Sequence, residues 1–185
     1  MHIVLVRHTT TDWNERGRQQ GQHDTKLNDK GEEEARALAE LLRKLPISKI
    51  VCSDLKRASA TADIIAEVLS KKVVLDERLR ECSFGEIEGM TEAEAFAKYG
   101  DKLKENWTKN YKHYDFKPYG GESREEVLSR HLECLRDMDT GLQDWVCIVG
   151  HDRALCTLLD YLKLDPKLPL GSYKTIEFNG QTKNA

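Results

Sequence analysis

Short apolar runs alternate with longer amphipathic stretches along most of the chain. Continuous apolar or β-branched character predicts five strands: residues 2–6, 49–53, 72–75, 145–150 and 173–178. Apolar positions at helical spacing predict four helices between these runs: residues 27–45, 55–69, 122–138 and 152–162. Because strands that alternate with helices need crossover connections, we predict an α/β fold, a three-layer α/β/α sandwich with a mostly parallel sheet.

One segment, residues 82–121, breaks this regular alternation. It contains Gly85, Gly89 and the sequence Pro-Tyr-Gly-Gly at 118–121, with a short helix predicted over 91–99. Because α/β folds keep their sites at the carboxyl edge of the sheet, we expect a lid insertion over that edge, within a single domain of residues 1–185. Its aromatic side chains either cover the substrate or only pack together: Trp107, Tyr111, Tyr114 and Tyr119.

Composition argues against several classes of protein. The 185 residues are 39% hydrophobic and 33% charged, and the net charge of −3 comes from both signs mixed along the chain. A nucleic-acid-binding or membrane-surface protein usually carries a basic patch instead. No apolar stretch approaches the ~20 residues that span a bilayer. Arg7 and His8 also interrupt the first apolar run where a signal peptide would continue.

Cysteine usage predicts a reducing compartment. The five cysteines are scattered, lie mostly in apolar segments and form no CxxC pair: Cys52, Cys82, Cys134, Cys147 and Cys156. An odd number in this arrangement favours buried, reduced thiols over disulfides or a zinc site. We therefore expect a cytoplasmic protein.

Two of the predicted strands end in histidine. His8 follows the strand at 2–6, and His151 follows the strand at 145–150. Because the carboxyl ends of parallel strands open into the same crevice, the two imidazoles could face each other. Either histidine alone is more typical of an ordinary turn, whereas the pair at equivalent places indicates a site.

Two arginines lie at the same predicted edge. Arg7 ends the first strand, and Arg57 lies in the first turn of the helix at 55–69. A cation is mildly unfavourable there, so an acidic partner or a bound anion explains Arg57 better than a solvated surface charge does. The guanidinium fork matches phosphate oxygens, and the edge therefore predicts a phosphate site. Asn14 and Gln20, in the loop after the first strand, could add neutral donors.

Six sequence blocks carry a family resemblance: LVRHTTTDWN, GRQQGQHDTKLNDKG, CSDLKRASATA, LRECSFGEIEG, GGESREEV and VGHDRAL. In this order and spacing, they make nearly the whole chain resemble the histidine phosphatase superfamily, in its phosphoglycerate-mutase-like branch. The chain is also similar to small phosphatases of the α-ribazole phosphatase type. A lone RHxxT motif has little specificity, but six blocks in sequence are specific. The resemblance implies a phosphoglycerate-mutase-like fold.

The resemblance also implies a role for each matching residue. His8 corresponds to the nucleophile that becomes phosphohistidine, and Glu81 corresponds to the acid that protonates the leaving oxygen. The remaining matches would bind phosphate: Arg7, Asn14, Gln20, Arg57 and His151, the last of these completing the catalytic set. Phosphoryl transfer depends chiefly on placement and on cationic stabilisation, and no metal or other cofactor is implied.

The assignment of Glu81 as the proton donor has alternatives close by in the sequence. Glu86 and Glu88 lie close to Glu81, and a carboxylate in this region could equally be a solvated loop charge. An acid that protonates the leaving oxygen must itself be protonated at the working pH. We therefore expect it to be buried or close to a like charge.

The chain departs from the family pattern at two positions. Thr9 stands where the family's RHG motif has glycine, so we expect its φ to be negative unless the backbone is strained. Asp152 follows His151 where the family has glycine in GHG. We expect this acid to favour the imidazolium form of His151, which suits a phosphate clamp.

The resemblance favours a phosphomonoester hydrolase acting on a small phosphorylated metabolite. A cofactor-dependent phosphoglycerate mutase is the alternative with the same chemistry, since KYGDKLKENWTKNY resembles the lid of the mutases. A catalytically silent phosphate-binding module is an alternative of another class. We expect neither a nucleic acid nor a membrane as partner. The sequence leaves the oligomeric state open, a homodimer included, as well as the alcohol part of the substrate.

Overall fold

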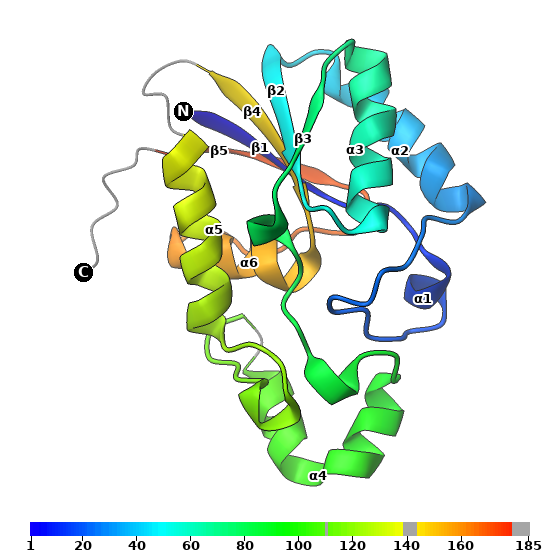
Figure 1. Ribbon diagram of the computed structural model, residues 1–185, viewed down its shortest axis with the longest axis vertical. Coiled ribbons are helices and arrows are strands. Elements are labelled where there is room, and N and C mark those ends of the chain that lie inside the picture. The colour runs from blue at the N-terminus through cyan, green and yellow to red at the C-terminus, as the bar shows by residue number, and fades with distance from the viewer. Residues whose placement is uncertain (110, 139–143, 179–185) are drawn as a thin grey trace.

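The sheet has five strands in the order β3-β2-β4-β1-β5. A computed structural model describes residues 1–109, 111–138 and 144–178 (Figure 1). The strands are β1 (His2–Arg7), β2 (Ile47–Cys52), β3 (Val73–Leu75), β4 (Trp145–Gly150) and β5 (Tyr173–Glu177). The first four pair in parallel, and β5 runs antiparallel to β1 at one edge. The prediction of a mostly parallel sheet is therefore confirmed.

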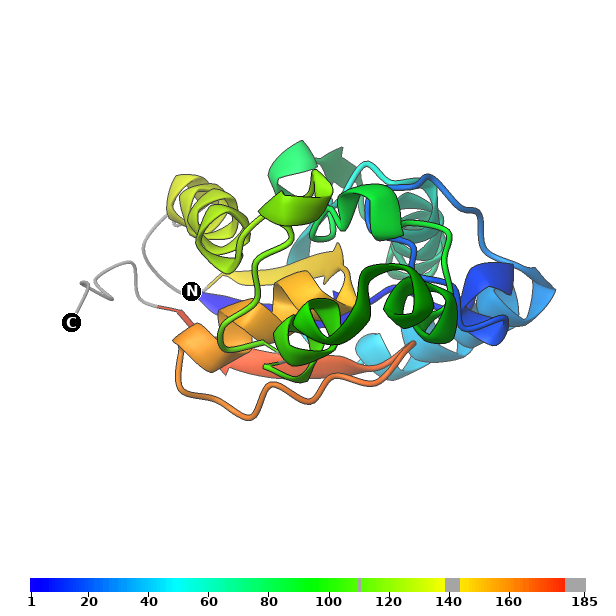
Figure 2. The same ribbon diagram turned by 90° about the horizontal axis from the view of Figure 1, so that it is seen from below.

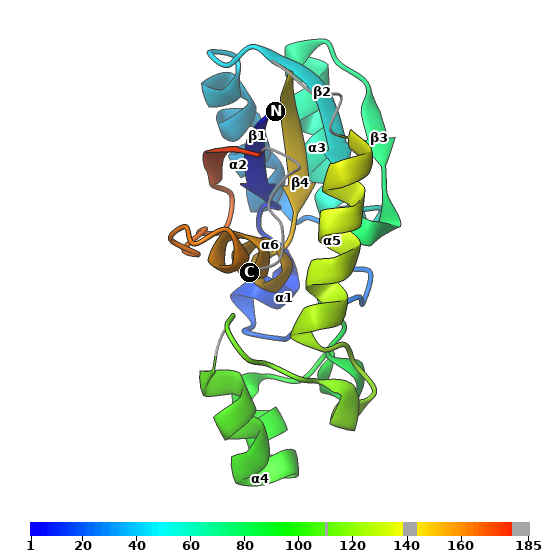
Figure 3. The same cartoon turned by 90° about the vertical axis from the view of Figure 1, so that its left-hand side faces the viewer.

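Helices cover both faces of this sheet. They are α2 (Asp29–Leu42), α3 (Lys56–Leu69), α5 (Arg124–Met138) and α6 (Asp152–Tyr161), close to the predicted bounds. Val4 and Val6 of β1 pack with α2 and α3, whereas Ile3 and Leu5 pack with α5 and α6. Figure 3 accordingly shows α2 and α5 on opposite sides of the strands. Among the described residues, no helix is long and apolar enough to cross a membrane.

The carboxyl ends of the strands are covered by two elements that differ from the prediction. The four-residue helix α1 (Asp12–Glu15) lies in the stretch predicted as a loop, because so short a helix shows no apolar period. The helix predicted at 91–99 is α4 (Glu92–Thr108), which changes direction at Gly100, where φ is 69°. Glycine reaches this backbone conformation without strain. Figure 2 views the molecule from the end that carries α4.

All five cysteines are free and buried, as the sequence predicts. Cys52 and Cys147 lie on adjacent strands of the sheet, and Cys134 lies on α5. Burial raises the pKa of each of these three thiols to about 12. The thiols are therefore protonated and unreactive at neutral pH.

Candidate active site

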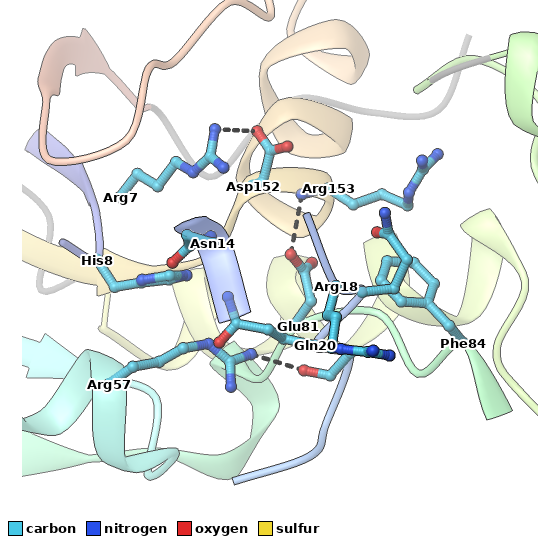
Figure 4. Close-up of a pocket in the computed structure, with 12 residues that line it drawn as sticks. Arg7, His8, Asn14, Arg18, Gln20, Arg57, Glu81, Phe84, Asp152 and Arg153 are labelled. Carbon is cyan, nitrogen blue, oxygen red and sulfur yellow. Dashed lines mark hydrogen bonds and ion pairs between the residues drawn. The ribbon is translucent and has the colours of Figure 1, made fainter. Parts of the chain in front are cut away.

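A cavity of about 90 Å³ opens beyond the carboxyl ends of β1 and β4 (Figure 4). Its wall consists of Arg7, His8, Asn14, Arg18, Gln19, Gln20, Gly21, Arg57, Glu81, Phe84, Asp152 and Arg153. Six of the seven residues predicted from the sequence are on this wall. The seventh, His151, lies behind it, with its ring centroid 5.3 Å from that of His8.

His8 presents an unprotonated nitrogen to the cavity. Its Nδ1 lies 2.7 Å from the carbonyl oxygen of Thr9, which can only accept a hydrogen bond, so Nδ1 carries the proton. The neutral ring then leaves the lone pair on Nε2. Burial, the positive charge of Arg57 and, to a smaller extent, that of Arg7 lower the pKa of His8 well below 6.5. At neutral pH the imidazole of His8 is therefore uncharged.

Arg57 is a buried cation held by backbone oxygens. Its Nη1 donates to the carbonyl of His23 at 2.8 Å, and its Nη2 donates to that of Gly21 at 2.6 Å. The side chain is fully buried, and burial lowers its pKa to about 10, so it is still charged at neutral pH. The two carbonyls fix the plane of the guanidinium beside His8.

Arg7 lies on the other side of His8 and is paired with Asp152. Its Nη1 donates to Oδ1 of Asp152 at 2.9 Å and to the carbonyl of Leu168 at 3.2 Å. This pairing makes the expectation for Asp152 wrong. The Asp152 carboxylate orients Arg7, while burial and the charge of Arg57 lower the pKa of His151 well below 6.5. His151 is neutral because desolvation outweighs its acidic neighbour.

His151 directly follows β4 and is the N-cap residue of α6. Its side chain is fully buried, yet neither ring nitrogen has a hydrogen-bond partner among the residues that the structure describes. Buried polar atoms are normally paired, so two orphaned nitrogens next to His8 indicate a place where a ligand supplies the missing partner.

Glu81 is positioned by the first turn of α6. Its Oε1 accepts from the backbone N–H groups of Cys82 and Ala154, both at 2.9 Å, and its Oε2 accepts from that of Arg153 at 3.2 Å. Burial and the charge of Asp152 raise the pKa of Glu81. This is the direction that a proton donor requires.

The two competing glutamates face elsewhere. The Glu88 carboxylate accepts from the backbone N–H groups of Gln22 at 3.1 Å and Phe84 at 3.0 Å, so it holds two loops together. Glu86 accepts from the hydroxyl of Tyr99 at 2.8 Å on the surface. Of the three, Glu81 alone is on the cavity wall.

The two predicted amides, Asn14 and Gln20, share a threonine. The Thr11 hydroxyl lies 2.9 Å from Oδ1 of Asn14 and 3.2 Å from Oε1 of Gln20. Thr25 also donates to Oε1 of Gln20. With the oxygens engaged, each amide keeps its NH₂ group for a ligand on the cavity side.

Thr9 replaces glycine without backbone strain. It is not among the residues with positive φ, in agreement with the expectation of a negative value. Its N–H donates to the hydroxyl of Thr61 at 3.3 Å, and the two hydroxyl oxygens are 3.2 Å apart. The added side chain therefore packs against α3 and stays out of the phosphate pocket.

An ion pair between Arg130 of α5 and Glu122, which precedes that helix, holds the segment that carries Glu81, and sequence reasoning missed it. Arg130 donates from Nη1 to the carbonyls of Arg78 and Arg80 at 2.7 and 2.6 Å, and from Nη2 to that of Glu81 at 2.9 Å. Its Nε and Nη2 also pair with the carboxylate of Glu122, both at 3.0 Å. Glu122 is the acidic residue of the GGES block, and that block was the feature of the sequence that could have revealed the ion pair.

Four side chains of the wall were also missed: Arg18, Gln19, Phe84 and Arg153. Arg18 and Gln19 fall inside the block GRQQGQHDTKLNDKG, although nothing local distinguishes them from their neighbours. Phe84 and Arg153 are far apart in the sequence, and no local pattern could reveal that they meet. No group of three or more His, Cys, Asp or Glu side chains in the described part of the chain is arranged to hold a metal ion.

Known proteins are similar to this chain over most of its length. A model of the histidine phosphatase superfamily (branch 1) matches residues 3–182. A glucosyl-3-phosphoglycerate phosphatase of Mycolicibacterium vanbaalenii is 40% identical over 152 residues, which cover 82% of this chain and 65% of that protein. A probable phosphoglycerate mutase of Escherichia coli is 35% identical over 169 residues, which cover 86% of this chain and 73% of the mutase.

Several solved structures are also similar to this chain. A mycobacterial glucosyl-3-phosphoglycerate phosphatase in complex with VO3 superimposes with a TM-score of 0.83 at 32% identity, over 95% of this chain and 90% of that one. A protein of Thermus thermophilus gives a TM-score of 0.77 at 30% identity, over 96% and 94% of the two chains.

Proposed function

The chain belongs to the histidine phosphatase superfamily, and we propose that it hydrolyses phosphate monoesters of a small metabolite through a phosphohistidine at His8. The observation that carries this proposal is the free Nε2 of His8, set between the guanidiniums of Arg7 and Arg57. The arginine and amide side chains of the cavity wall suit an anionic ligand. The similarity to a named phosphatase supports hydrolysis.

In the first step, Nε2 of His8 attacks phosphorus in line and the bond from phosphorus to the ester oxygen breaks. The leaving oxygen takes a proton from Glu81, so the alcohol departs neutral. Arg7 and Arg57 stabilise the charge on the equatorial oxygens, and a neutral His151 donates from one ring nitrogen. The Nδ1–H of His8 stays bound to the carbonyl of Thr9 throughout, which keeps Nε2 aimed at the substrate.

In the second step, water replaces the alcohol. Glu81, now ionised, accepts a proton from the water while its oxygen attacks phosphorus and the bond to Nε2 breaks. Inorganic phosphate leaves, and both His8 and Glu81 return to their starting states. Segment 82–121 is proposed as the lid over the cavity, since it carries Phe84 of the cavity wall and the aromatic residues that pack against Phe84. The five free thiols support a cytoplasmic setting.

The proposal is tested with p-nitrophenyl phosphate and no added metal. The wild type should release p-nitrophenol and form an acid-labile phosphoenzyme in rapid-quench labelling. His8→Ala should lose both, with turnover reduced on the order of 10⁴-fold, as expected when a nucleophile is removed. His113→Ala, at an exposed histidine, is the matched control and should behave like the wild type. Retained labelling in His8→Ala would place the nucleophile elsewhere.

A phosphoglycerate mutase is the second candidate, because the Escherichia coli relative is named as a probable one. A mutase returns the phosphoryl group to the substrate, whereas a phosphatase passes it to water. The enzyme should therefore be given 3-phosphoglycerate with a trace of the bisphosphate. Rapid formation of 2-phosphoglycerate without free phosphate would replace the phosphatase proposal by the mutase.

A further inference from the structure

Arg57 and Glu81 reach the cavity wall from segments that are separate in the sequence (Figure 4). In the proposed reaction, Arg57 in the first turn of α3 binds the phosphoryl group, and Glu81 protonates the leaving oxygen. That oxygen is bonded to the phosphorus atom of the bound phosphoryl group. Because an acid acts only within hydrogen-bond reach of the atom it protonates, the two side chains must be held at a fixed separation.

The main chain at Glu81 has no regular structure to hold it. Glu81 lies between the single-turn helices Glu77–Leu79 and Gly85–Ile87, in a stretch without helix or strand. Its carbonyl oxygen accepts from two side chains, from Nη2 of Arg130 at 2.9 Å and from Nε2 of Gln22 at 3.1 Å. Arg130 thus links this stretch to α5, and Gln22 links it to the loop that follows β1.

The same loop holds the Arg57 guanidinium. The carbonyls of Gly21 and His23 accept from it at 2.6 and 2.8 Å, and Gln22 is the residue between them. The backbone on both sides of Gln22 therefore binds the phosphate ligand, while the side chain of Gln22 binds the segment that carries the acid.

The Gln22 amide has a defined orientation. Besides the Glu81 carbonyl, its Nε2 donates to Oε2 of Glu122 at 3.2 Å. A carbonyl and a carboxylate can only accept, so the NH₂ end of the amide, with its two protons, faces them. The Glu122 carboxylate is itself held by its ion pair with Arg130. Gln22 is not among the residues of the described cavity wall, so these contacts are its route to the reaction.

We propose that Gln22 is a positioning residue that holds the main chain of Glu81 in register with Arg57. This inference rests on the proposed function, because it takes Arg57 as a phosphate ligand and Glu81 as the acid. It makes the phosphate-binding loop and the acid-bearing segment one unit, joined by a side chain that does not touch the substrate.

The test removes the amide with Gln22→Leu, which has a similar size and no donor. For n-propyl phosphate, kcat/KM should fall roughly tenfold, because an alkoxide leaves poorly when the acid is misplaced. For p-nitrophenyl phosphate, kcat/KM should fall less than about threefold, because the phenolate leaves unaided and Arg57 still binds the phosphoryl group. The loss on propyl phosphate should lie in kcat, with KM within about twofold of the wild type.

Two further variants complete the test. Gln22→Asn keeps the amide but is one methylene shorter, so it should give a smaller loss with the same dependence on the leaving group. It decides the question if thermal melting shows that Gln22→Leu does not fold. Asn28→Ala removes the N-cap of α2, whose Oδ1 accepts from the N–H of Gly31 at 3.0 Å. This control should lower the melting temperature and leave kcat/KM for both esters unchanged.

A loss on propyl phosphate no larger than that on p-nitrophenyl phosphate would overturn the inference, as would a loss that lies in KM alone. In either case, phosphoenzyme labelling at His8 with p-nitrophenyl phosphate would leave the proposed function standing. If the wild type hydrolyses neither ester, the proposed function itself is wrong.

Discussion

Two parts of the cavity wall, an inner wall of Arg7, His8 and Arg57 and an outer wall of Arg18, Phe84 and Arg153, position their cations by different means. On the inner wall, backbone carbonyls hold two of the three side chains: those of Gly21 and His23 hold Arg57, and that of Thr9 orients His8. The third, Arg7, pairs with the carboxylate of Asp152. On the outer wall, the side chains of five aromatic residues surround Arg153. A carbonyl remains whatever side chain its residue carries, whereas a single substitution can remove one of the five rings. The contrast teaches that the surroundings of His8 and Arg57 depend less on individual side chains than those of Arg153 do.

The largest effect is expected on the inner wall, from Arg57→Gln. An amide cannot hold both carbonyls and also neutralise phosphate, so kcat/KM should fall ~10³-fold. The loss should be similar for p-nitrophenyl phosphate and for all alkyl phosphates, because every substrate shares the phosphoryl group. Steady-state kinetics with at least three substrates measures this.

The control for this variant is Arg36→Gln, which removes an exposed arginine paired with Glu32 on α2. It should leave kcat/KM unchanged. A loss in Arg57→Gln that differs strongly from one alcohol to another would contradict the proposal that Arg57 binds the phosphoryl group.

Glu81 lies between the walls, and Glu81→Gln should show an effect that depends on the leaving group. For n-propyl phosphate, kcat/KM should fall ~10²-fold, because an alkoxide leaves poorly without a proton. For p-nitrophenyl phosphate, kcat/KM should fall far less, since the phenolate leaves unaided. Equal losses for both substrates would contradict the role of Glu81 as the acid.

The pH profile of wild-type kcat/KM for propyl phosphate sharpens this test. Burial raises the pKa of Glu81, so activity should fall as the pH rises through that value, above the usual range of carboxyl groups. Burial lowers the pKa of His8, so the loss on the acid side should begin only well below pH 6.5. Glu81→Gln should lack the alkaline decline.

The smallest effect is expected from Arg130→Gln, which acts on Glu81 only through its position. Loss of the bonds to three carbonyls should lower kcat/KM for propyl phosphate roughly tenfold, below the ~10²-fold that a 1 Å misplacement can cost. The alkaline decline in the pH profile of kcat/KM should shift as well, because the surroundings of Glu81 change. The pH profile is the decisive measurement.

Arg124→Gln is a matched control on the same helix. It breaks the Arg124–Asp160 ion pair of 2.9 Å, whose side chains are buried to nearly the same extent as those of Arg130 and Glu122. Both variants should lower the melting temperature. If Arg124→Gln moves the pH profile as far as Arg130→Gln does, then Arg130 has only a structural role.

The sequence predicts the inner wall because its signals are local. An apolar run that ends in Arg7 and His8 places both at a strand end, and the same pattern places His151. Strand order, the antiparallel β5 and the short helix α1 have no comparable local signal. Arg130 and Glu81 are 49 residues apart, and Arg7 and Asp152 are 145 apart. Contacts between such residues depend on how the elements pack, which one sequence without relatives does not reveal.

The misjudged effect of Asp152 has the same origin. From the sequence, an acid next to His151 raises the affinity of the imidazole for a proton. In the fold, the carboxylate pairs with Arg7, and the full burial of His151 has the larger influence on its pKa. Neighbours in the chain need not be electrostatic neighbours in space.

The buried, protonated cysteines have a consequence for the protein in a stressed cell. Phosphatases that attack with a thiolate are silenced when peroxide or an alkylating drug reaches that sulfur. Here the proposed attacking atom is an imidazole nitrogen, and no sulfur lies on the described cavity wall. The proposed phosphatase activity should persist through an oxidative burst, and iodoacetamide should distinguish it from that of thiol-dependent phosphatases in a crude extract.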